Sequence, residues 1–167
     1  VDRLVSAEPV INALRGRKTS AELERIRKAV EITNEIFEKT FAFVKVGMTE
    51  IEVGEYMHKL AKEYGVGLAW PAENCPAVNS GPDSPVGHNG PTDIKIERGH
   101  IIHFDFGVKV KDYCSDIQRV CYVLREGETV APPEVQRGFV TLRTAIEQSR
   151  EAMKSGVAGN SIDVLSR

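Results

Sequence analysis

The stretch that decides the fold is HFDFGVKVKDYCSDIQR, residues 103–119. Apolar and polar residues alternate on both sides of a turn near Lys111 and Asp112, which predicts a buried β-hairpin over residues 100–124. Two aspartates, Asp105 and Asp116, stand eleven residues apart within this hairpin. An ionised carboxylate in such a place is costly unless it is paired or binds a metal ion. The two acidic groups of the hairpin therefore need a partner.

Strand alternation places Asp105 on the same face as His103 and Gly107. We expect Asp116 on the return strand at nearly the same level, although the sequence leaves the exact register open. The two carboxylates then lie within a few ångströms to about 10 Å of each other, where like charges repel. A divalent cation such as Mn²⁺, Co²⁺ or Zn²⁺ would remove the repulsion, and so would a salt bridge. The candidate partners for a salt bridge are Arg119, Lys109 and Lys111. Spacing alone favours the salt bridge, because structural ion pairs outnumber metal sites.

Three further side chains are candidates for a functional site, and each has an ordinary structural alternative. His88 lies in the Gly- and Pro-rich loop PVGHNGPTD and could donate to a substrate carbonyl or assist proton transfer, or it is a solvated loop histidine. His103 could support Asp105 from the same strand face, or it is a half-exposed strand residue. Trp70 could line a pocket for an apolar group, although core packing is the default for a lone tryptophan.

Two capping boxes indicate the helices that precede the hairpin. Thr19 with Glu22 begins a long helix, and Thr49 with Glu52 begins a second one. Apolar residues recur at helical spacing in both segments. In the first they are Leu23, Ile26, Val30, Thr33, Phe37, Phe41 and Val44, and in the second Val53, Met57, Leu60, Ala61 and Tyr64. One short strand is expected near residues 75–79, and a third helix over 134–154.

The end of the chain repeats the pattern of its start. Each end has a long predicted helix, followed by a glycine (Gly47 or Gly156) and then by the triplet Ile-acid-Val. We therefore expect a lead-in over residues 1–18, the first half of a repeated catalytic domain over 19–126, and the start of its second half over 127–167. The sequence is interpreted as a piece of a longer protein.

Composition narrows the class of protein. The 167 residues are 41% hydrophobic and 28% charged, which is enough for a domain with a core. A formal net charge of −2 gives no strong field for nucleic acid or an anionic membrane, and no apolar run approaches the length of a membrane span. The three cysteines form no C-x-x-C pair, which fits a reduced, cytoplasmic protein.

The order of these motifs resembles a known family. The segment GHNGPTDIKIERGHIIHFDFGVKVKDYCSDIQRVCYVL resembles the first half of the catalytic domain of the pita-bread metallopeptidases. That family includes methionine aminopeptidase, Xaa-Pro aminopeptidase, Xaa-Pro dipeptidase (prolidase) and the metal-free creatinase. The family pattern consists of a loop His, a Gly before a strand, the motif D-x-G, the motif Y-x-S-D and a following Arg. In this sequence the matching residues are, in the same order, His88, Gly99, Asp105–Gly107, Tyr113–Asp116 and Arg119. The upstream segment LRGRKTSAELERIRKAVEI is similar to the prolidase and Xaa-Pro aminopeptidase branch.

The resemblance implies an α+β fold, the first half of a pita-bread fold, with helices packed on an antiparallel sheet. It implies that Asp105 and Asp116 are the first two ligands of a dinuclear site for Mn, Co or Zn ions. It also implies that His88 contacts the substrate and steadies a tetrahedral intermediate. The other family ligands, one His and two Glu, belong to the second half and have no counterpart here. Weaker candidates for supporting the ligands or contacting the substrate are His103, Arg119 and Trp70.

The implied activity is that of a metal-dependent exopeptidase, either an Xaa-Pro dipeptidase or an Xaa-Pro aminopeptidase. Its partner would be a peptide or dipeptide with proline at the second position, with a homodimer left open and no nucleic acid or membrane expected. We expect residues 1–167 alone to be inactive and to bind no metal tightly, because they hold two of the five family ligands. The alternative is a non-catalytic pita-bread module that binds a peptide or a protein.

Overall fold

The computed structural model describes residues 4–85, 87 and 89–166. The chain separates into two compact units, Val1–Val123 and Leu124–Arg167. The expected domain boundaries after residues 18 and 126 stay predictions. Among the described helices, none combines the length and the apolar character that a membrane crossing requires.

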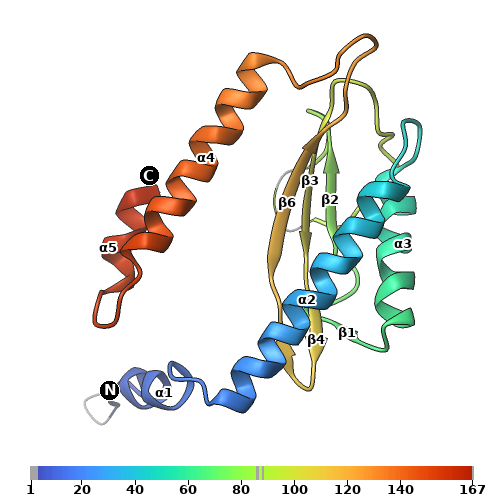
Figure 1. The fold of residues 1–167 in the computed structure, drawn as a ribbon. Helices are drawn as coiled ribbons and strands as arrows, with labels where there is room; N and C mark the ends of the chain where they lie inside the picture. The colour runs from blue at the N-terminus through green and yellow to red at the C-terminus, as the bar shows by residue number, and fades with distance from the viewer. Residues whose placement is uncertain (1–3, 86, 88, 167) are drawn as a thin grey trace. The chain divides into compact units, whose positions relative to one another are not determined.

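The first unit packs helices against antiparallel strands (Figure 1). Its helices are α1 (Glu8–Arg15), α2 (Ser20–Phe43) and α3 (Glu50–Glu63), and its strands are β1 (Gly67–Leu68), β2 (Ala77–Ser80), β3 (Ile101–Phe106), β4 (Val108–Val110), β5 (Tyr113–Cys114) and β6 (Ile117–Tyr122). The hydroxyls of Thr19 and Thr49 accept hydrogen bonds from the Glu22 and Glu52 N–H groups, and the two glutamates accept from the threonine N–H groups in return. Both predicted capping boxes are therefore confirmed.

The second unit consists of α4 (Pro133–Ala152), α5 (Gly159–Asp163) and the 3₁₀ turn η1 (Val164–Ser166). α4 matches the helix predicted over residues 134–154. Gly156 after α4 has a φ of +86°, and Gly47 after α2 has a φ of +92°. Both copies of the helix–glycine pattern therefore use a backbone conformation that favours glycine.

The strands form two small antiparallel sheets. One has the strand order β2-β3-β6 and the other the order β1-β4-β5. The hairpin turns at Lys111 and Asp112, whose φ values of +46° and +67° are both positive, as a type I′ turn requires. The predicted hairpin and its turn are thus confirmed, and the strand expected near 75–79 is β2. The short strand β1 was not predicted.

Asp116 was predicted on the return strand, with any bulge left open, and it lies near Asp105 as expected but in a break between two strands. Asp105 on β3 pairs with Gln118 on β6, whereas Asp116 lies in the break between β5 and β6. The break lies opposite Gly107, where an added Cβ would stand 2.0 Å from the Ser115 carbonyl oxygen, so only glycine fits. This close approach bends the hairpin and moves Asp116 out of the ladder.

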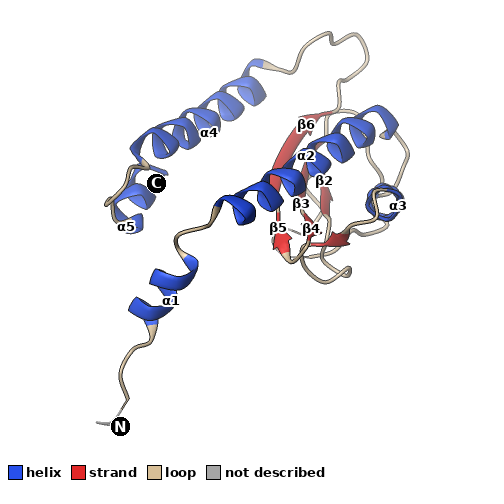
Figure 2. Cartoon of the chain, turned by 60° about the horizontal axis from the view of Figure 1, so that its bottom comes forward, coloured by secondary structure: helices blue, strands red, loops and turns tan. Residues whose placement is uncertain are grey.

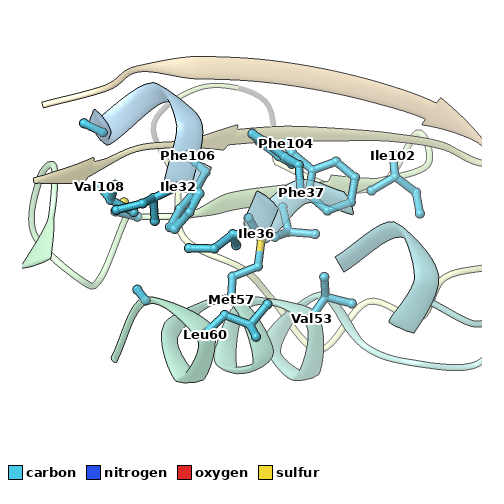
Figure 3. Close-up of a cluster of buried hydrophobic side chains, with 14 of the residues drawn as sticks. Ile32, Ile36, Phe37, Val53, Met57, Leu60, Ile102, Phe104, Phe106 and Val108 are labelled. Carbon is cyan, nitrogen blue, oxygen red and sulfur yellow. The ribbon is translucent and has the colours of Figure 1, made fainter. Parts of the chain in front are cut away.

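The core of the first unit lies between α2, α3 and one face of the β2-β3-β6 sheet (Figures 1 and 2). The side chains labelled there are Ile32, Ile36, Phe37, Val53, Met57, Leu60, Ile102, Phe104, Phe106 and Val108 (Figure 3). Phe37 meets Phe104 edge to face, with ring centroids 6.1 Å apart. Alternation along β3 then sends His103 and Asp105 to the opposite face of the sheet. That face carries the candidate site.

The apolar stripe predicted for α2 was partly wrong. Leu23 and Phe41 are 38% and 40% exposed, whereas Thr33 and Phe37 are buried as predicted. The buried residues of α2 are Ala29, Ile32, Thr33, Ile36, Phe37 and Thr40. The predicted stripe missed Ala29, Ile32, Ile36 and Thr40, so it lay to one side of the true contact face. In α3 the predicted residues Val53, Met57, Leu60 and Ala61 are all buried.

Candidate active site

A cavity of about 710 Å³ opens on the face of the sheet opposite the core. Three paired strands line it: β2 supplies Asn79, β3 supplies His103 and Asp105, and β6 supplies Gln118. The loop that follows β2 adds Ser84. Because the backbone ladder fixes the spacing of the strand residues, their side chains meet in a defined arrangement.

Asp105 is incompletely hydrogen-bonded. Its Oδ2 accepts a hydrogen bond from Gln118 Nε2 at 3.3 Å, while its Oδ1 is buried and has no hydrogen-bond partner. Burial raises the pKa of the Asp105 carboxyl above its ordinary value, and the charge of Asp116 raises it further. A buried acceptor without a donor is unfavourable in a folded protein. Asp105 Oδ1 is therefore free to bind a ligand.

Asp116 projects from a backbone that its neighbour holds in place. Ser115 is buried, and its hydroxyl accepts a hydrogen bond from the Val108 N–H at 2.9 Å. The same hydroxyl lies 2.7 Å from the Thr33 hydroxyl of α2. These contacts tie the break between β5 and β6 to the core, while the Asp116 side chain itself is exposed.

The two carboxyl groups interact with each other. The charge of the nearby Asp116 raises the pKa of the Asp105 carboxyl, after the larger effect of burial. Two ionised carboxylates that interact in this way repel each other. Within the described ranges, neither carboxylate forms an ion pair with a basic side chain. Among the described residues, no Lys or Arg side chain therefore neutralises the pair.

His103 connects Asp105 to the loop after β2 through a chain of hydrogen bonds. Its Nε2 lies 3.1 Å from Gln118 Oε1, and its Nδ1 lies 3.2 Å from Asn79 Oδ1. The Gln118 amide donates onward to Asp105, and the Asn79 amide donates to the Pro85 carbonyl oxygen at 2.9 Å. Since both amide NH₂ groups are used in this way, both amides present their oxygen to the ring, and each tautomer of His103 donates to one of the two oxygens. His103 thus lies beside Asp105, on the predicted strand face.

Ser84 is a second cavity residue with an unpaired polar atom. It is 5% exposed, and its hydroxyl makes no hydrogen bond. Across residues 4–85, 87 and 89–166, the buried side-chain N and O atoms without a partner are the Ser84 hydroxyl and Asp105 Oδ1, and both residues line the cavity. Two unsatisfied polar groups on one cavity wall indicate that the cavity receives a polar or charged ligand.

The other residues predicted for the site lie elsewhere or cannot be placed. The Arg119 guanidinium lies over the Phe37 ring, 5.7 Å from its centroid, on the core side of the sheet. Trp70 donates its indole N–H to a backbone carbonyl at 2.8 Å and packs against the core. Neither side chain lines the cavity. His88 falls outside the described residues.

Sequence reasoning missed Asn79, Ser84 and Gln118. Gln118 lies opposite Asp105 only because of the strand register, which the sequence leaves open. Asn79 lies in β2, a strand whose pairing partner the sequence did not reveal. Ser84 belongs to a loop, and no periodic pattern predicts the path of a loop.

The carboxylate oxygens present are of the type that binds divalent cations, but there are too few of them to complete a metal site. Carboxylate oxygens bind hard and borderline divalent ions, and the free Asp105 Oδ1 is such a donor. Within the part of the chain that the structure describes, no group of three or more His, Cys, Asp or Glu side chains is arranged to hold a metal. Asp105 and Asp116 therefore fit as part of a metal site that further ligands must complete.

Comparison with protein families matches residues 24–167 to the metallopeptidase family M24. The chain is 29% identical over 158 residues to an uncharacterized peptidase of Staphylococcus aureus strain USA300, and 28% identical over 161 residues to one of Staphylococcus saprophyticus. These alignments cover 94% and 96% of this chain but 42% and 43% of the relatives. The chain thus spans less than half the length of the curated relatives it matches.

Solved structures of peptidases also match this chain over less than half of their own length. The X-Pro aminopeptidase of Thermotoga maritima matches with a TM-score of 0.83 and 29% identity, over 95% of this chain and 43% of its own. The prolidase of Pyrococcus furiosus matches with a TM-score of 0.83 and 28% identity, over 95% of this chain and 45% of its own. These matches confirm the predicted α+β fold, part of a pita-bread fold with helices on an antiparallel sheet.

Proposed function

We propose, because this chain belongs to the metallopeptidase family M24, that Asp105 and Asp116 bind divalent metal ions in a peptidase that acts on peptides with proline at the second position. The observation that carries the proposal is the carboxylate pair, in which a buried Asp105 oxygen without a donor stands beside a second acidic group. The activity is proposed for the whole protein, in which other residues complete the set of ligands.

Separate observations support Asp105 and Asp116 as metal ligands. Asp105 Oδ1 is free to bind a cation, while Gln118 restrains Oδ2. Asp116 offers its carboxylate from a backbone that Ser115 anchors. Bound divalent ions would supply a polarised water and Lewis-acid stabilisation of the developing oxyanion. Their positive charge would also remove the repulsion that raises the pKa of Asp105.

The substrate class follows from the cavity together with the relatives. A cavity of about 710 Å³ is large enough for a short peptide, and Pro82 and Ile101 give it apolar surface beside the polar Ser84 and His103. The structural neighbours named X-Pro aminopeptidase and prolidase support proline at the second position. We propose that His88 contacts the substrate and that the metal is Mn²⁺, Co²⁺ or Zn²⁺. We also propose that the whole protein forms a homodimer.

The test is peptide hydrolysis by the whole protein after loading with Mn²⁺. We expect hydrolysis of an Xaa-Pro dipeptide or of a longer peptide with proline second, and slower hydrolysis of the matched alanine peptide. Asp105→Asn and Asp116→Asn abolish activity, because each removes a ligand charge. Asp112→Asn, at an exposed carboxylate in the hairpin turn, leaves activity unchanged.

Two results would contradict this proposal separately. Equal rates on the proline and alanine peptides would remove the proline preference and leave a general peptidase. Activity that survives both Asp105→Asn and Asp116→Asn would remove the metal assignment.

A further inference from the structure

Glu50 is a buried carboxylate that the proposed chemistry does not use. It is the first residue of α3, and its exposed fraction is 0%. Such a group is tolerated only where donors surround it. Oε1 accepts from the Ser80 N–H at 2.6 Å, and Oε2 accepts from the Thr92 N–H at 2.9 Å and the Thr92 hydroxyl at 2.7 Å. The positive end of the α3 dipole adds a favourable field.

The two residues that Glu50 holds are the two ends of one loop. Ser80 is the last residue of β2, and Thr92 follows the loop 81–91. Each carboxylate oxygen therefore fastens one end of the loop to the start of α3. The Ile51 N–H donates to the Thr92 carbonyl oxygen at 3.0 Å and adds a backbone contact at the far end. One side chain thus fixes the separation of the two loop ends.

The fastened loop forms part of the cavity wall. It supplies Ser84, whose hydroxyl is unpartnered, and the glycines Gly81 and Gly87. Its Pro85 carbonyl accepts the hydrogen bond of Asn79, which ends the chain of contacts that starts at Asp105. A displacement of the loop would therefore move groups that face the cavity while leaving both aspartates in place.

We propose that Glu50 is a positioning residue, which holds Ser80 and Thr92 on α3 and thereby sets how Ser84 and Pro85, which lie between them in the chain, meet the cavity beside Asp105. Its link to catalysis rests on the proposed function, whereas the anchoring of the loop does not depend on it. The role differs from general stabilisation because its effect is confined to the loop and to the ligand in the cavity.

Four variants separate these roles. Glu50→Gln keeps the size of the side chain but replaces one acceptor with an NH₂ group, so one end of the loop loses its contact. Thr92→Val removes the hydroxyl, which donates to Glu50 and accepts from the Ile94 N–H at 3.3 Å, and it leaves both backbone donors to Glu50 in place. Glu55→Gln is the matched control, an exposed carboxylate on the same helix. Ile36→Val weakens the core on α2 without touching the loop.

The first measurement is residue-resolved amide hydrogen exchange. In Glu50→Gln we expect the Ser80 or Thr92 amide to exchange about tenfold faster or more, relative to the amides of β3. Thr92→Val gives a smaller acceleration, at Thr92 and at Ile94, whose N–H loses its acceptor. Glu55→Gln gives none, and Ile36→Val gives no acceleration specific to the loop ends. If exchange in Glu50→Gln rises equally at the loop ends and in β3, Glu50 only stabilises the fold and the proposal is overturned.

The second measurement is kcat and KM of the whole protein loaded with Mn²⁺, on the Xaa-Pro peptide. Per folded molecule, Glu50→Gln lowers kcat/KM by about 10- to 100-fold, because misplaced contacts near reacting groups are costly, and Ile36→Val leaves it unchanged. Wild-type kinetics in Glu50→Gln would overturn the positioning role. A wild-type protein without any peptidase activity would refute the proposed function instead, and the exchange result would still decide whether Glu50 anchors the loop.

Discussion

Ser115, Ser84 and Asp105 differ in how fully their polar side-chain atoms are hydrogen-bonded. Ser115 lies against the Val108 backbone and the Thr33 hydroxyl. Ser84 is almost as buried but has no partner. Asp105 uses one oxygen and leaves the other free. Ser115 thus has partners within the protein, whereas the Ser84 hydroxyl and Asp105 Oδ1 keep an unpaired polar atom at the cavity.

Ser115→Ala should destabilise the protein. The substitution leaves the buried Val108 N–H without an acceptor and removes the contact with Thr33. We expect the free energy of unfolding to fall by about 1–3 kcal/mol, which urea denaturation measures. Unchanged stability would show that the break before Asp116 is held by other contacts.

Ser84→Ala should not destabilise the protein, although Ser84 is nearly as buried as Ser115. It removes a hydroxyl that has lost its water and gained no partner, so the ligand-free protein should keep its stability or gain up to about 1 kcal/mol. The variant should bind peptide more weakly, which a titration of the whole protein with an Xaa-Pro peptide measures. A loss of stability as large as that of Ser115→Ala would show that the Ser84 hydroxyl is paired inside the protein.

The start of α2 depends on a charged cap. Hydrogen bonds from the Thr19 backbone and hydroxyl, and from the Tyr113 hydroxyl, lower the pKa of Glu22 from 4.5 to about 2. A carboxyl whose pKa is lower in the folded state stabilises the fold above pH 4.5, and this contribution is lost as the pH falls toward 2.

Glu22→Gln should therefore be less stable than the wild type near neutral pH and approach it as the pH falls toward 2. Denaturation at a series of pH values measures the difference between the two proteins. In a Thr19→Ala background, which lacks the cap hydroxyl, the same substitution should have a smaller pH-dependent effect. A wild-type advantage that stays constant from neutral pH down to pH 2 would contradict the assignment of the low pKa to the cap.

Elements whose signals are local were predictable from the sequence, and elements set by long-range contacts were not. Thr19 and Thr49 each form a capping box with a glutamate three residues later, which predicts the start of a helix. Lys111 and Asp112 lie at the predicted hairpin turn. The register that sets Gln118 against Asp105, and the break that displaces Asp116, depend on the close approach of Gly107 to Ser115. No local pattern encodes that contact, so the sequence identified the acidic pair but not its surroundings.

At the scale of the molecule, the first unit places a buried core on one face of a small sheet and a polar cavity on the other. The same alternation along β3 produces both, because Ile102, Phe104 and Phe106 enter the core while His103 and Asp105 face the cavity. The repulsion within the carboxylate pair is the cost of this arrangement in the absence of a cation. A metal ion that binds only the folded state should therefore stabilise the whole protein by mass action.

The central claim, that Asp105 and Asp116 form part of a metal site, is tested most directly by the melting temperature of the whole protein with and without Mn²⁺. Wild type and Asp112→Asn should be stabilised by the metal, by about 2.7 kcal/mol when Mn²⁺ is at 100 times its Kd. Asp105→Asn and Asp116→Asn should lose this gain, and Asp105→Asn should melt no lower than wild type without metal, because it removes a destabilised charge. A metal-induced shift that survives in both variants would show that the two carboxylates are not ligands and would contradict the account.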